Sequence, residues 1–113
     1  MILELAHFRI QPGANAAFEA AFAAAQELLT VTPGYRDDTL QLCIEDASEY
    51  RLLVQWNSVD DHMHGFRGSP RFAQWRALLS PFFVAPPSAS HYKRVFPDAS
   101  ETCAHCSPTF QLP

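Results

Sequence analysis

Apolar side chains recur along the chain with two different periods, and their order predicts an order of strands and helices. Residues 1–10 are rich in Ile, Leu and Phe and predict a strand that ends at Pro12-Gly13. Residues 14–30 have high helix propensity, and Thr32-Pro33-Gly34 is expected to end this helix. Its apolar stripe, suited to packing on a sheet, consists of Phe18, Phe22, Ala25 and Leu29.

The middle of the chain alternates apolar and polar residues, as in a β-hairpin. In segment 35–45 the apolar positions of this alternation are Leu40, Leu42 and Ile44. The polar run 45–49 predicts the turn. Segment 50–57 is expected to place one set of side chains on a single face: Tyr50, Leu52, Val54 and Trp56.

A broken helix and a last strand are expected to follow. Ser58 precedes two aspartates in a pattern typical of a capping box, and the helix that it starts should break at Gly65 or Gly68. Ser69-Pro70 restarts a helix, with Ser as N-cap and Pro at the first helical position. Its expected buried stripe is Phe72, Trp75, Leu78 and Leu79. Residues 89–96 predict the fourth strand.

The order β-α-β-β-α-β is the split βαβ pattern of an α+β, ferredoxin-like fold with an antiparallel sheet. Both helices must then cover one face of the sheet. The other face would still carry Leu, Val and aromatic side chains, so we expect a homodimer that buries it, a dimeric α+β barrel. The domain should span residues 1–96, with a polar C-terminal tail over residues 97–113.

Composition narrows the range of partners. The 113 residues suit one domain, and 48% hydrophobic with 18% charged residues is typical of a globular protein. A net charge of −4, with eight basic residues and no run of them, argues against binding to nucleic acid or to an anionic membrane. Apolar runs are too short for a membrane span, and the first residues do not resemble a signal peptide. Three cysteines without an export signal favour reduced thiols and a cytoplasmic location.

One stretch carries a family resemblance. Residues 55–62, Gln-Trp-Asn-Ser-Val-Asp-Asp-His, followed by Phe66-Arg67-Gly68-Ser69 and Phe72, resemble the W-x-S-x-x-x-H…F-x-x-S…F pattern of antibiotic biosynthesis monooxygenase (ABM) domains. The opening strand with its Pro-Gly and the Ala/Phe/Glu helix are similar to that family too, as is the ending at residues 90–95. The resemblance covers about residues 1–96.

The resemblance implies a dimeric α+β barrel with a pocket between helices and sheet. Characterised oxygenases of this family oxidise phenolic or anthrone-type polyketide substrates with molecular oxygen and without metal or flavin. The protein would supply a dry aromatic cavity, a proton acceptor and donors that stabilise the enolate. We therefore expect a cofactor-free monooxygenase acting on a small aromatic or polyketide-like molecule. The alternative is a non-catalytic small-molecule-binding or stress-associated protein on the same fold.

A haem-degrading branch of the family uses an Asn, Trp and His triad. Its places are taken here by His7, Phe66 and Trp75, so haem degradation is not expected.

Histidines are the candidate proton acceptors. His62 is either a locally hydrogen-bonded residue at a helix start or a pocket residue that accepts a proton near neutral pH. His7, within the first strand, is either hydrogen-bonded in place or supports His62 from the pocket. His91 in the last strand has the same two interpretations, as a weaker, substrate-contacting candidate. His64 is expected on the surface.

Aromatic residues are the candidate cavity wall. We expect Trp56, Phe66, Phe72 and Trp75 to line the core and the pocket together, and Tyr92 to offer a phenol either to a ligand or to the dimer interface.

The tail holds a Cys103-Ala104-His105-Cys106 cluster whose thiolates and imidazole suit zinc. A structural site needs four ligands, and no second pair lies nearby. An ordinary tail is the first interpretation, with a metal or redox role second. No metal or other cofactor is therefore expected.

Overall fold

The protein folds as one antiparallel sheet with its helices on one face. The structure, a computed structural model, describes residues 1–97 of the chain. The elements in chain order are β1 (Ile2–Arg9), α1 (Asn15–Thr30), β2 (Tyr35–Leu42), β3 (Glu49–Trp56), a π-helical segment η1 (Asp61–Phe66), α2 (Pro70–Leu79), a 3₁₀ turn η2 (Ser80–Phe82) and β4 (Ser88–Tyr92).

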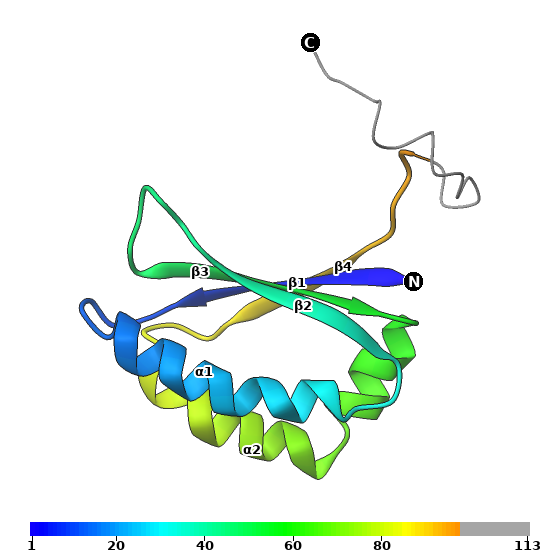
Figure 1. Cartoon of the computed structure of the whole chain (residues 1–113), viewed down its shortest axis with the longest axis horizontal. Coiled ribbons are helices and arrows are strands. Elements are labelled where there is room, and N and C mark those ends of the chain that lie inside the picture. The colour runs from blue at the N-terminus through cyan, green and yellow to red at the C-terminus, as the bar shows by residue number, and fades with distance from the viewer. Residues whose placement is uncertain (98–113) are drawn as a thin grey trace.

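The strand order β2-β3-β1-β4 is that of the split βαβ pattern, and all neighbouring strands are antiparallel. Helices α1 and α2 lie side by side beneath the sheet, and within residues 1–97 no layer covers its other face (Figure 1). This confirms the predicted α+β, ferredoxin-like architecture.

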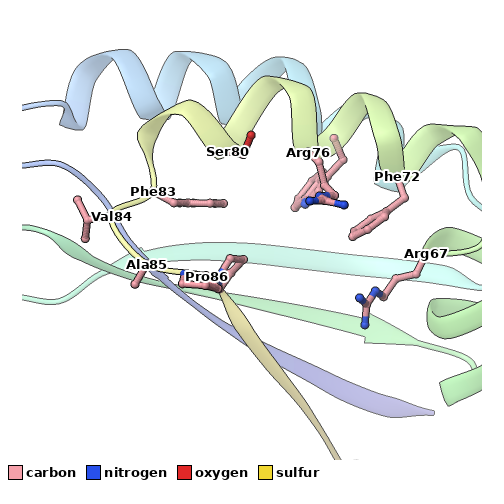
Figure 2. Close-up of a pocket in the computed structure, with 10 residues that line it drawn as sticks. Arg67, Phe72, Arg76, Ser80, Phe83, Val84, Ala85 and Pro86 are labelled. Carbon is pink, nitrogen blue, oxygen red and sulfur yellow. The ribbon is translucent and has the colours of Figure 1, made fainter.

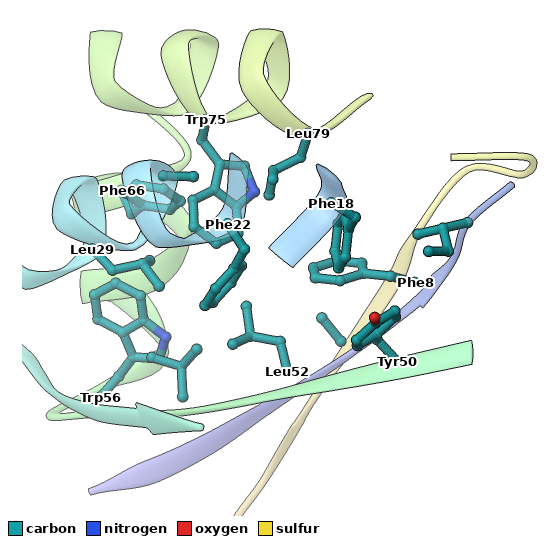
Figure 3. Packing of buried hydrophobic residues seen from close by; sticks show 14 residues of the cluster. Phe8, Phe18, Phe22, Leu29, Tyr50, Leu52, Trp56, Phe66, Trp75 and Leu79 are labelled. Carbon is teal, nitrogen blue, oxygen red and sulfur yellow. The ribbon is translucent and has the colours of Figure 1, made fainter. Parts of the chain in front are cut away.

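The core lies between the helices and the inward face of the sheet (Figure 3). The predicted stripe of α1 is buried, and so is the predicted face of β3. Aromatic rings connect the two layers: the centroids of Phe18 and Tyr50 lie 4.8 Å apart, and those of Phe22 and Trp75 lie 5.8 Å apart. Burial of each such side chain contributes about 1.5–3 kcal/mol relative to exposure. The prediction for α2 was partly wrong, because Leu78 is 37% exposed while Leu79 is buried.

Two strand ends were predicted too long. Segment 35–45 leaves the sheet after Leu42, the hairpin tip rises on the side of the sheet away from the helices, and Ile44 is 95% exposed (Figure 1). The fourth strand ends at Tyr92 and does not reach residue 96. Tyr92 pairs with Leu3, one residue after the start of β1, and the β1–β4 ladder ends at this pair.

The turn from β3 into η1 follows the predicted capping box. Ser58 Oγ accepts the backbone N–H of Asp61 at 3.1 Å. The next segment is wound wider than an α-helix, because the N–H of Arg67 donates to the carbonyl of His62, five residues back, at 2.9 Å. Both His62 and Phe66 are thereby buried. The helix breaks at the second of the predicted glycines, Gly68.

None of the helices within residues 1–97 combines the length and the apolar character that a membrane crossing requires.

Candidate functional site

Four polar side chains meet inside the layer between sheet and helices. Glu4 occupies an inward position of β1, two residues before Ala6, and is almost fully buried. His91 lies directly opposite Glu4 in the β1–β4 register. Trp56 ends β3, and His62 enters from η1. The sheet register and the cap at Ser58 therefore bring together residues that lie up to 87 positions apart in the chain.

These side chains form a continuous chain of contacts. Trp56 Nε1 donates to Glu4 Oε1 at 2.9 Å, and His62 Nε2 lies 3.3 Å from the same oxygen. His62 Nδ1 lies 2.8 Å from His91 Nε2. The imidazole of His62 also stacks on the indole of Trp56, with ring centroids 5.4 Å apart. Every nitrogen of His62 thus has a partner, which fixes the orientation of its ring.

Burial moves the proton affinities of the two central groups in opposite directions. Loss of solvation raises the pKa of Glu4 from 4.5 to about 7, although the Trp56 hydrogen bond and the Arg67 charge lower it in part. Loss of solvation, together with the His91 and Arg67 charges, lowers the pKa of His62 from 6.5 to about 4. At neutral pH His62 is therefore neutral, while Glu4 stands close to the midpoint of its titration.

One arrangement of protons satisfies all of these contacts. With a proton on His62 Nε2 and another on His91 Nε2, Glu4 Oε1 accepts from Trp56 and faces His62 Nε2–H at 3.3 Å, while His62 Nδ1 accepts from His91. Glu4 Oε2 takes no part in a hydrogen bond or ion pair within residues 1–97. This oxygen is left to carry or accept a proton from the cavity that Glu4 lines.

That cavity has a volume of about 150 Å³ and lies between the sheet and the helices. Glu4, His62 and Arg67 are its charged or titratable residues, and most of the remaining wall is apolar: Ala6, Phe8, Leu29, Leu52, Phe66, Phe72, Trp75, Pro87 and Ala89. Such a wall excludes water around the carboxyl group and strengthens the electrostatic interactions within.

A wider pocket of about 640 Å³ lies beside the inner cavity. The two spaces share Arg67, Phe72, Trp75 and Pro87. Figure 2 shows the side chains from α2 and from the segment after it pointing into the wider space. The inner cavity and this vestibule therefore adjoin, with Glu4 at the inner end and the vestibule at the open end.

The structure brings most of the sequence-predicted residues to this site. His62, Phe66, Phe72 and Trp75 line the inner cavity. Trp56 lies behind it as the donor to Glu4, and His91 contacts His62 from β4.

Two predicted residues lie elsewhere. His7 has the opposite parity to Glu4 and Ala6, so it projects from the outer face of the sheet, where its side chain is 42% exposed and 3.7 Å from Glu49. Tyr92 likewise pairs with the outward Leu3 and is 53% exposed. Neither is among the cavity-lining residues. His64 is on the surface as predicted, with 83% of its side chain exposed.

Sequence reasoning missed Glu4 and Arg67. The signal for Glu4 was present, because a carboxylate at an inward position of an otherwise apolar strand is costly unless it is partnered or functional. Arg67 lies within the family-like stretch, yet nothing in its spacing shows that its guanidinium faces a cavity.

No group of three or more metal-binding side chains gathers within residues 1–97. The candidate cluster at Cys103, His105 and Cys106 lies outside the described residues.

Comparisons with known proteins agree with this architecture. The family model for antibiotic biosynthesis monooxygenases matches residues 1–78. The Bacillus subtilis protein YczJ is 37% identical over 95 residues, which span 84% of this chain and all of that protein. The crystal structure of a candidate antibiotic biosynthesis monooxygenase from Bordetella bronchiseptica is 39% identical, with a TM-score of 0.80, covering 83% of this chain and 96% of that one. SnoaB from Streptomyces nogalater, a cofactor-independent oxygenase, shares the fold at 20% identity and a TM-score of 0.70, over 85% of this chain and 96% of its own.

Proposed function

Because the chain belongs to the antibiotic biosynthesis monooxygenase family, we propose that it is a cofactor-independent monooxygenase for a small aromatic or polyketide-like substrate. The observation that carries this proposal is the buried Glu4 carboxyl group, whose pKa of about 7 suits proton transfer at neutral pH. It lines an apolar cavity large enough for one aromatic ring. The likeness to SnoaB, a cofactor-independent oxygenase, supports the same chemistry.

The first step removes a proton from an acidic C–H or O–H group of the substrate. The sequence favours His62 as acceptor, but both of its ring nitrogens are engaged. We therefore assign the first acceptor to Glu4 Oε2, with His62 behind it. The Nε2–H of His62 and the Nε1–H of Trp56 face Glu4 Oε1 and stabilise the Glu4 carboxylate, which is the form that accepts the substrate proton.

The remaining steps balance without a cofactor. For an anthrone-type substrate, the enolate passes one electron to dioxygen, and the two radicals combine into a peroxide at the former CH₂ carbon. Loss of water from this peroxide leaves a carbonyl group. One oxygen atom enters the product and the other leaves as water, while the substrate carbon supplies all of the electrons.

His62 and His91 hold the Glu4 carboxyl group in place. His91 is half-buried on the edge strand β4 and contacts His62, whose Nε2 lies 3.3 Å from Glu4 Oε1. The proton that Glu4 takes from the substrate returns to the peroxide and leaves in the water, so the cycle releases no net proton. His62, the sequence-predicted acceptor, thus acts as a positioning residue for Glu4.

We further propose that the protein acts as a cytoplasmic homodimer. The outward residues Leu3, Leu5 and Leu53 lie together on the uncovered face of the sheet, with Leu5 opposite Leu53. A second copy would bury them, as the family resemblance implies.

Oxygen uptake tests the proposal. Purified protein, freed of metal by chelation and of flavin by gel filtration, is mixed with anthrone in an oxygen electrode between pH 5.5 and 8.5. We expect a rate well above the protein-free rate that rises with pH through about 7. Glu4→Gln should lower kcat by about 10²–10⁴-fold and remove the inflection.

Matched variants control for general effects. Glu27→Gln makes the same change as Glu4→Gln on the exposed side of α1. His64→Asn replaces an exposed histidine, as a surface control for the same change at His62. Both controls should keep the wild-type rate. Tight binding of anthrone and related phenols without oxygen uptake would refute catalysis and favour a non-catalytic binding protein.

A further inference from the structure

Two arginines flank one aromatic ring where the inner cavity meets the vestibule. The Cζ atom of Arg67 lies 5.2 Å from the centroid of Phe72, and that of Arg76 lies 6.0 Å from it. Figure 2 shows Arg76 and Phe72 projecting from α2 into the pocket, with the side chain of Arg67 below Phe72, at the level of the sheet. Contact with the ring holds both guanidinium groups at the vestibule wall.

These two arginines have no carboxylate partner within residues 1–97. Several other arginines of the fold use their donors internally. Arg9 pairs with Asp46 at 2.8 Å, and Arg71, also on α2, donates to Thr32 Oγ1 at 3.1 Å. Neither guanidinium group at the vestibule wall forms an ion pair within residues 1–97, although the Arg67 charge also lowers the pKa of Glu4, so the two mark a local positive site on a protein whose net charge is −4.

The vestibule contains no acidic residue among those that line it. Its lining otherwise consists of aromatic, proline and small side chains. At about 640 Å³ it has the size of an ordinary small-molecule site, whereas the inner cavity at about 150 Å³ holds about one ring. A fused aromatic substrate must therefore place one ring by Glu4 and extend the rest past Phe72.

We propose that Arg67 and Arg76 form a carboxylate-binding subsite, so that the substrate is an aromatic acid whose carboxylate lies remote from the ring that reacts. A carboxylate accepts paired hydrogen bonds from a guanidinium fork, and two forks beside an aromatic wall select for a planar anion over a neutral molecule of equal shape. This inference rests on the proposed function where it names the bound acid as the substrate. Binding of the acid can be measured without turnover.

Isothermal titration under nitrogen tests the subsite with two matched probes, 6-hydroxy-2-naphthoate and its neutral amide, 6-hydroxy-2-naphthamide. Wild-type protein should bind the acid about tenfold or more tightly than the amide at low salt. Arg76→Gln should reduce this preference to about threefold, and Arg67→Gln combined with Arg76→Gln should abolish it. The affinity for the amide should fall much less than that for the acid, and circular dichroism spectra that match the wild type show that the variants remain folded.

Arg36→Gln is the control, because it removes the same charge from β2, where Arg36 donates to Asn57. It should leave the preference intact. Equal affinity for acid and amide in the wild-type protein, or a preference that survives the double substitution, would overturn the proposal. Because no oxygen is present, an acid preference without catalysis would leave this subsite standing while the oxygenase proposal failed. Catalysis without an acid preference would leave the oxygenase proposal standing while the carboxylate subsite failed.

Discussion

Replacement of Glu4 by Gln should change how stability depends on pH. Burial raises the pKa of Glu4 from 4.5 to about 7, so the folded protein keeps a proton that the unfolded chain has already released. The stability that depends on this proton is fully present below pH 4.5 and is lost as the pH rises through 7. Gln retains an oxygen to accept from Trp56 Nε1 and carries no charge at any pH.

The structure sets the size of the effect. Between pH 5 and pH 8.5 the shift corresponds to a loss of about 2–3 kcal/mol in wild-type protein. His62 acts in the other direction, because its lowered pKa adds stability above pH 6.5 that is lost as the pH falls towards 4. The two trends oppose each other in wild-type protein. Glu4→Gln leaves only that of His62, so the variant should become more stable with rising pH.

Urea denaturation at a series of pH values measures this, at fixed protein concentration because dimerisation would otherwise contribute. The difference in unfolding free energy between Glu4→Gln and wild type should move in favour of the variant by about 2–3 kcal/mol from pH 5 to pH 8.5. Glu27→Gln should show no such trend. Parallel curves for wild type and Glu4→Gln over this range would refute the assignment of a raised pKa to Glu4.

Three further substitutions test other parts of the structure. Trp56→Phe removes the donor that lowers the Glu4 pKa, so the pH midpoint of oxygen uptake should move above 7. The free energy of unfolding should fall by about 1–3 kcal/mol. An unmoved midpoint would show that Trp56 does not influence the Glu4 pKa. Leu53→Asp places a charge on the uncovered sheet face and should convert a dimer into a monomer in light scattering; a persisting dimer would contradict a sheet-to-sheet interface. Gly34→Ala, at φ 91° with a neighbouring side chain in the space that a Cβ needs, should cost about 2 kcal/mol or more in urea denaturation. Gly13→Ala, at φ 83° in open space, should cost less, and equal losses would argue against the close contact.

The sequence predicted the fold well because its periodicities report burial. The α1 stripe and the inward face of β3 are where the spacing places them. Strand ends were harder, since they depend on partners: β4 ends at Tyr92, opposite Leu3 near the start of β1, which no local pattern in residues 89–96 reveals.

The site was only partly predictable for a related reason. His62 and two cavity aromatics, Phe66 and Phe72, lie in the stretch that resembles the family, so their place near a pocket followed from the resemblance. The contact of His62 with His91 depends on sheet register, which sequence spacing does not fix. His7 was placed by residue type alone, although strand parity assigns it to the face opposite Glu4.

Oxygen-isotope labelling tests the proposed oxygenation most directly. Metal-free and flavin-free protein is incubated with anthrone under ¹⁸O-labelled dioxygen, and the product is analysed by mass spectrometry beside a Glu4→Gln sample. We expect anthraquinone with one labelled oxygen, formed much faster by wild-type protein than by the variant, with the second labelled atom in water. An unlabelled product, equal rates for the two proteins, or a rate that returns only on addition of metal or flavin would contradict cofactor-free oxygenation at Glu4.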